Sequence, residues 1–164
     1  MKRRSIAALA ALSALAGCGF ALRGEQKFAF STIAVNAPQA GPVAVDLRRA
    51  LGGRERALSA GAPPLGPEVV VDIVNEQREK TVVGVNAAGQ VREFQLRIRV
   101  RFKLRSVAGK ELIAETEILQ QRDISFNESA VLAKEAEESL LYRDMQGDIV
   151  QQLMRRLAAV ASIT

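Results

Sequence analysis

Residues 94–105 read FQLRIRVRFKLR, and this stretch decides the fold. Apolar and polar side chains alternate at every position of the stretch, and five of its six polar residues are basic. Successive side chains of a β-strand point to opposite faces, so this period of two predicts a strand with one buried and one solvated face. A half-buried strand of this kind is typical of an antiparallel sheet.

The sequence on both sides of this strand predicts five further elements. They are, in chain order, a strand at 30–35, a short amphipathic helix at 43–51, a strand from 68 to 83 or 85, a strand at 111–126 and a long helix at 130–160. Residues 84–90 and 106–110 form the connecting turns, and the Pro- and Gly-rich stretch 54–67 is a loop. This order predicts an α+β fold: a two-layer sandwich in which two helices pack on one face of a mostly antiparallel four-stranded sheet.

The basic residues of the central strand are the first candidate site. Five cations share one face of this strand at a spacing of ~6.8 Å, which would suit the phosphate groups of an anionic partner. They are Arg97, Arg99, Arg101, Lys103 and Arg105.

The other interpretation of this face is a solvated surface that the next strand neutralises. A hairpin centred near residue 108 would place Arg105 opposite Glu111, Arg101 opposite Glu115 and Arg99 opposite Glu117. In that register Arg97 and Lys103 stay unpaired, so both interpretations remain open.

The composition excludes most catalytic chemistry. The chain has 164 residues, no His and one Cys, so imidazole bases, Ser-His and Cys-His dyads and His- or Cys-rich metal sites are absent. We therefore expect one domain, no enzyme activity, no cofactor and no metal. Three of the 23 basic residues lie in the first four positions, and the other 20 face 18 acidic residues. With one Tyr and no Trp as well, nucleic-acid binding is not expected.

The N-terminus predicts a lipoprotein leader. Lys2, Arg3 and Arg4 precede about a dozen apolar or small residues, which suits a secretory signal and is too short to span a bilayer. The leader ends in LAGC at 15–18, which looks like a bacterial lipobox. We expect residues 1–17 to be removed and 18–164 to form one periplasmic domain with a lipidated Cys18. Gly19 in place of Asp favours the outer membrane.

Three motifs carry a resemblance to a known family. CGFALRG at 18–24 resembles the mature N-terminus of the lipopolysaccharide-assembly lipoproteins of the LptE family. GQVREFQL at 89–96 resembles a strand start of that family, and AKEAE at 133–137, followed by Met145 and QQL at 151–153, resembles its C-terminal helix. The resemblance covers nearly the whole mature chain.

The resemblance implies an outer-membrane lipoprotein that sits as a plug inside the LptD β-barrel, assists barrel assembly and binds lipopolysaccharide. The family's lipopolysaccharide-contacting lysine matches Lys134. Its companion arginine has no match, since NAA stands at 86–88, and Arg92 or the strand arginines would have to substitute. The alternative is another outer-membrane lipoprotein of similar fold, serving as an accessory subunit of a transport system or as an envelope scaffold.

We predict that the chain is cleaved between Gly17 and Cys18 and lipidated at Cys18. The intact mass of the membrane-purified protein should equal that of residues 18–164 plus diacylglycerol and an acyl chain. The variant Cys18→Ala should remain an uncleaved or untethered precursor. A retained leader or an unmodified Cys18 would contradict the predicted anchor.

Overall fold

The computed structural model describes residues 26–39 and 41–163, which form four strands, two α-helices and two short 3₁₀ turns. The strands are β1 (Ile33–Asn36), β2 (Val69–Val85), β3 (Val91–Ser106) and β4 (Glu111–Ser125). The helices are α2 (Pro42–Leu51) and α3 (Val131–Ala158), and the 3₁₀ turns are η1 (Gly52–Arg54) and η2 (Glu128–Ala130). The leader, Cys18 and the first family-like motif lie outside the described residues. Neither described helix is long and apolar enough to cross a membrane.

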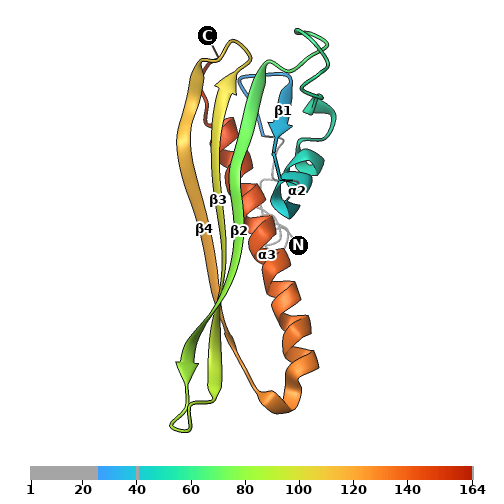
Figure 1. The fold of residues 1–164 in the computed structure, drawn as a ribbon. Coiled ribbons are helices and arrows are strands. Elements are labelled where there is room, and N and C mark those ends of the chain that lie inside the picture. The colour runs from blue at the N-terminus through green and yellow to red at the C-terminus, as the bar shows by residue number, and fades with distance from the viewer. Residues whose placement is uncertain (1–25, 40, 164) are drawn as a thin grey trace, which may run out of the picture.

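The predicted α+β architecture is confirmed. The strands lie in the order β1-β2-β3-β4, and both helices cover the same face of the sheet (Figure 1). β1 pairs parallel to β2 through the connecting helix α2, whereas the other neighbours are antiparallel. β1 begins three residues later than predicted, but Phe30, which precedes it, is still buried in the core.

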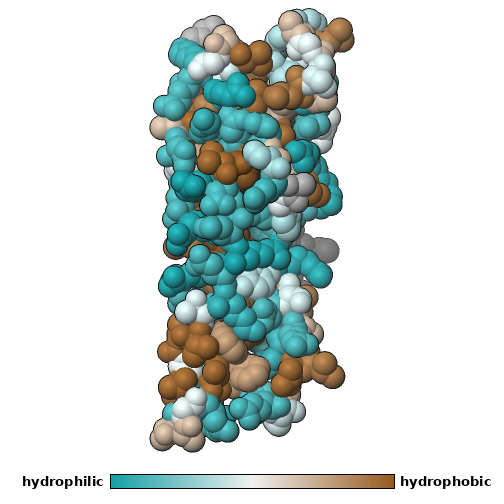
Figure 2. Space-filling view, viewed as in Figure 1, coloured by the Kyte–Doolittle hydropathy of each residue, from teal (hydrophilic) through white to brown (hydrophobic). Residues whose placement is uncertain are grey.

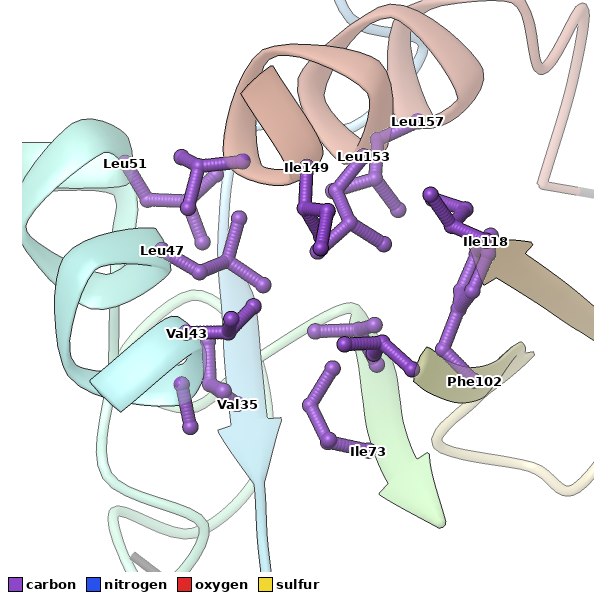
Figure 3. Packing of buried hydrophobic residues seen from close by; sticks show 14 of the residues in the cluster. Val35, Val43, Leu47, Leu51, Ile73, Phe102, Ile118, Ile149, Leu153 and Leu157 are labelled. Atoms are coloured by element: carbon purple, nitrogen blue, oxygen red, sulfur yellow. The ribbon is translucent and has the colours of Figure 1, made fainter. Parts of the chain in front are cut away.

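The core lies between β3 and the two helices. The inward side chains Leu96, Ile98, Val100, Phe102 and Leu104 are completely buried, as the alternation in the sequence predicts. Leu47 and Leu51 of α2 and Ile149, Leu153 and Leu157 of α3 meet this face from the other layer (Figure 3). Each fully buried side chain of this size contributes about 1.5–3 kcal/mol, so burial of this one face dominates the stability of the fold.

A bulge in β2 changes which of its side chains face the helices. Ile73 pairs with Phe102 and Asn75 with Arg101, so Val74 is an extra residue in the ladder. Beyond the bulge Glu76, Arg78 and Lys80 lie opposite the inward residues of β3. The second half of β2 therefore presents charged side chains to the helix layer.

Glu76 caps the start of α2 from the neighbouring layer. Its Oε1 accepts a hydrogen bond from the Val43 N–H at 3.2 Å, in the first turn of the helix. Burial raises the pKa of Glu76, and the hydrogen bonds from Val43 and Ala44 oppose that rise only in part. A Cβ on Gly41 would clash with the Glu76 carboxylate, so a larger residue there would displace this carboxylate from the helix start.

The predicted β3–β4 register is wrong over most of its length. Arg105 does lie opposite Glu111, but Arg101 lies opposite Glu117 and Arg99 opposite Leu119. The cause is two irregularities in β4 on either side of Ile113, each of which inserts one extra residue. From Thr116 onward the shift is two residues, which keeps each side chain of β4 on its own face, whereas Ile113 between the two irregularities lies opposite inward Leu104.

Asn127 caps the 3₁₀ turn η2 that leads into α3. Its side chain accepts a hydrogen bond from the Ser129 N–H at 3.0 Å. The Ser125 hydroxyl, two residues earlier, accepts a hydrogen bond from Lys134 of α3 at 2.9 Å.

Asp72 joins the first three strands on the outer face of the sheet, which is the face opposite the helices. It accepts hydrogen bonds from the Asn36 amide at 2.6 Å and from Arg105 Nε at 2.8 Å. Burial by itself raises the pKa of Asp72, but these two hydrogen bonds and the charge of Arg105 outweigh it, so the net pKa lies below the usual range.

The two faces of β3 should respond very differently to substitution. Ile98→Asp places an unpaired charge in the core, which should lower the free energy of unfolding by several kcal/mol. Arg101→Gln removes an exposed ion pair and should cost less than about 1 kcal/mol. Chemical denaturation of the two variants measures both effects, and equal losses would contradict the orientation of the strand.

Acid should weaken the Asp72 connection. Because its pKa is lowered in the folded state, its charge stabilises the fold above the unfolded pKa of about 4, and this contribution disappears as the pH falls further. The Asp72→Asn variant should be less stable than the parent at pH 7. As the pH falls below about 4, its free energy of unfolding should decrease less than that of the parent. Unfolding curves between pH 7 and pH 2 test this; a parallel pH dependence of both proteins would refute it.

Candidate functional site

Neighbouring carboxylates largely neutralise the outer-face cations. Arg101 pairs with Glu115 at 3.0 Å and Arg99 with Glu117 at 3.7 Å. These are the partners that the sequence suggests, reached diagonally across the ladder because of the β4 irregularities. Arg105 pairs with Asp72 instead of Glu111.

Two cations of this face form no ion pair among the described residues. Arg97 donates to the Gln95 side chain at 2.7 Å and lies opposite Glu79, and Lys103 lies opposite Asp72, whose pKa its charge helps to lower. The outer face is therefore a solvated, mostly compensated surface on which Arg97 and Lys103 stand outside ion pairs.

Lys134 lies in the other layer, near the start of α3. Its Nζ donates to Ser125 Oγ at 2.9 Å and pairs with Glu137 at 2.9 Å. The sheet thus separates Lys134 from the row of cations on the outer face, and the structure does not bring these predicted residues into one site. Arg92 belongs to the same end of the molecule as Lys134, because its carbonyl accepts a hydrogen bond from the N–H of Phe126 at 2.7 Å, one residue beyond Ser125.

Lys134 borders a pocket of about 210 Å³ between the start of α3 and the ends of β3 and β4. We call it the distal pocket; its walls are Phe94, Ile124, Phe126 and Val131, and its polar residues are Lys80, Ser125, Lys134, Glu135 and Glu138. The rings of Phe94 and Phe126 meet edge to face with their centroids 5.3 Å apart. This aromatic pair gives the pocket a defined apolar wall.

A second lysine, Lys80 of β2, lies across the pocket from α3. Its Nζ is 2.6 Å from Glu138 Oε2 and 4.3 Å from the centroid of the Phe94 ring. The sequence does not predict Lys80 as a site residue, because an unbroken strand would place it on the outer face. Only the bulge at Val74 turns it toward the helices.

Exposed apolar side chains lie at the same end of the molecule as the distal pocket. Val82, Val83 and Val85 at the end of β2 are 46–60% exposed, and Leu132 at the start of α3 is 82% exposed. Figure 2 shows the resulting brown groups at the end of the molecule that holds the β2–β3 hairpin and the start of α3. Exposed apolar side chains next to a pocket are typical of a binding surface, although others lie at the opposite end of the domain, such as Leu65 and Val107.

The distal pocket therefore combines an apolar wall with two ammonium groups at its border. This arrangement suits an amphiphilic anion, whose hydrocarbon part contacts the phenylalanines while its charged group meets the lysines. Within residues 26–39 and 41–163, no group of three or more His, Cys, Asp or Glu is arranged to hold a metal ion.

The similarity to known proteins is extensive. Residues 30–157 match the family model LptE, described as lipopolysaccharide-assembly. The solution NMR structure of lipoprotein B from Nitrosomonas europaea is 35% identical, with a TM-score of 0.72 over 86% of this chain and 91% of that one. No curated protein sequence matches the chain.

Two further structures share the fold. Rare lipoprotein B from Shewanella oneidensis is 17% identical, with a TM-score of 0.64 over 78% of this chain and 94% of that one. A minor lipoprotein from Acinetobacter baumannii is 18% identical, with a TM-score of 0.62 over 81% and 94% of the two chains.

Proposed function

Because the chain belongs to the LptE family of lipopolysaccharide-assembly proteins, we propose that it is an outer-membrane lipoprotein that binds lipopolysaccharide at the distal pocket. In this proposal Cys18 carries the lipid that tethers the domain, and residues 18–164 form one periplasmic domain. The protein acts by binding and not by catalysis.

The amphiphilic character of the distal pocket is the observation that carries this proposal. Lipopolysaccharide joins acyl chains to phosphorylated sugars, so it needs an apolar surface and cations side by side. The Phe94–Phe126 wall supplies the first, and Lys80 and Lys134 supply the second. The outer face offers cations, but few exposed large apolar side chains lie beside them in the described structure, chiefly Leu119 at 44% and Val74 at 40%.

Arg92 is the third cation of this end in the proposal. It is exposed, it forms no ion pair among the described residues, and its backbone is hydrogen-bonded to Phe126. Arg92 is therefore a better substitute for the family's companion arginine than the arginines of the outer face, because those lie on the opposite side of the sheet from the pocket.

We further propose that the domain occupies the lumen of an LptD-type β-barrel and assists its assembly. The family membership and the outer face support this role. Paired charges make that face hydrophilic without giving it a large net charge, as a surface facing a water-filled lumen requires.

Lipopolysaccharide binding should depend on Lys134 and Arg92, the cations at the end of the molecule that holds the distal pocket, and not on the cations of the outer face. Replacing both Lys134 and Arg92 with Gln should weaken binding at least tenfold, whereas replacing Arg97 and Lys103 should change it less than twofold. Added salt should weaken binding by the parent protein, since the Debye length falls from ~10 Å at 0.1 M to ~3 Å at 1 M. Titration with lipopolysaccharide micelles measures the affinities.

Lys110→Gln is the matched control, because Lys110 is exposed in the β3–β4 turn at the opposite end of the molecule. Melting temperatures and co-purification with a large β-barrel from solubilised outer membranes should be unchanged in all variants. Unchanged lipopolysaccharide binding by the distal variant would refute this site. Failure to recover a barrel with the parent would refute the plug role.

A further inference from the structure

A second cavity lies between β2, α2 and α3, apart from the distal pocket, and measures about 480 Å³. We call it the arginine cleft, because each of these elements contributes one guanidinium to it. They are Arg78 of β2, Arg49 of α2 and Arg143 of α3. Its only lining carboxylate is Asp46, so the described lining carries an excess of two positive charges.

Arg78 is held rigidly in the arginine cleft. Its terminal nitrogen donates to Gln146 Oε1 at 2.6 Å, and its guanidinium lies 5.3 Å from the centroid of the Tyr142 ring. Gln146, which is 8% exposed, also donates through its amide nitrogen to Asp46, and Tyr142 donates to the Glu79 carbonyl at 2.9 Å. Several of the five N–H donors of Arg78 remain available for a ligand.

Arg143 has no such structural role. It is exposed, and within the described chain it forms neither a hydrogen bond nor an ion pair, whereas Arg49 pairs with Asp46 at 2.5 Å. Three guanidiniums that line one solvent-filled cavity repel one another, and a cleft lined by one sign of charge concentrates counter-ions. A bound anion would relieve this repulsion.

From this geometry we infer that the arginine cleft is a second ligand site, which binds the phosphate group of a phosphorylated sugar. Guanidinium groups match phosphate oxygens with two parallel hydrogen bonds, and Arg78 and Arg143 bring such groups to the cleft from two different elements, β2 and α3. The volume lies in the range of ligand pockets and exceeds what one phosphate ion fills. Ser139 offers a hydroxyl oxygen to sugar hydroxyl groups, because its own proton is donated to the Glu135 carbonyl.

This inference goes beyond the proposed function, since it neither uses the distal pocket nor needs lipopolysaccharide as the ligand. The phosphorylated sugar is either a soluble molecule or the headgroup of a lipid. Both present the phosphate group that the arginines recognise.

The test is calorimetric titration of the full chain in non-ionic detergent with N-acetylglucosamine 1-phosphate. Saturable binding is expected, with inorganic phosphate at least fivefold weaker and N-acetylglucosamine without detectable binding. Arg143→Gln should weaken the sugar phosphate at least tenfold while the melting temperature holds. Arg78→Lys, which keeps the charge but loses the planar fork, should also weaken it.

Arg155→Gln is the matched control, because Arg155 is exposed on the same helix and does not line the cleft. Equal affinity in the Arg143→Gln variant, or equal binding of the neutral sugar, would overturn the inference. So would binding of an acidic peptide in place of the sugar phosphate, since that would indicate a protein partner.

Competition by lipopolysaccharide distinguishes the two forms. If lipopolysaccharide displaces the sugar phosphate from the parent and from the Lys134→Gln variant, the cleft binds the lipid-linked form. If lipopolysaccharide does not displace it, the cleft binds the soluble form. Both results support the cleft, and neither depends on the outcome at the distal pocket.

Discussion

Burial of one face of β3 determines where every other element of this fold must lie. The inward side chains from Leu96 to Leu104 are completely buried, and an isolated strand cannot bury them. β2 and β4 extend the sheet on either side, and α2 and α3 close the same face from above. The opposite face of β3 is left polar, so the arginines follow from the strand's position as much as from any ligand. A fold arranged in this way has its charged sheet surface and its helix layer on separate sides.

A single extra residue in β2 gives this simple architecture its polar features. Before Val74 the strand turns Val71 and Ile73 into the core, and after it the same face carries Glu76, Arg78 and Lys80. These three charged residues have different uses: Glu76 caps α2, Arg78 lines the arginine cleft, and Lys80 borders the distal pocket. The apolar contribution of β2 thus ends at the bulge, although Ile98 and Leu96 of β3 stay buried beyond it, and both candidate binding sites are built on this part of the helix–sheet interface.

The sequence predicts those parts of the fold that follow from periodicity. The alternation from Phe94 to Arg105 and the four-residue spacing from Leu141 to Leu157 give the central strand and the long helix, and with them the α+β class. The irregularities near Val74 and Ile113 have no such signal, because each depends on how neighbouring strands pair. For this reason the sequence yields Lys134 by family resemblance but misses Lys80, and it predicts the ion-pair partners Glu115 and Glu117 while misplacing the strand register that joins them.

The pairing of the distal lysines bears on which ligands the pocket can select. Lys134 contacts Glu137 and Lys80 contacts Glu138, so an incoming phosphate competes with a carboxylate for each ammonium group. An exposed ion pair contributes about 0.2–1 kcal/mol, whereas each buried CH₂ contributes about 0.8 kcal/mol. Burial of two or three methylene groups of a ligand against Phe94 and Phe126 therefore offsets the free energy lost when both lysine–glutamate ion pairs are broken. Phosphate alone gains little from such an exchange, and an uncharged chain gains nothing from the lysines. The paired lysines thus favour a molecule that carries both groups, as the proposed lipopolysaccharide ligand does.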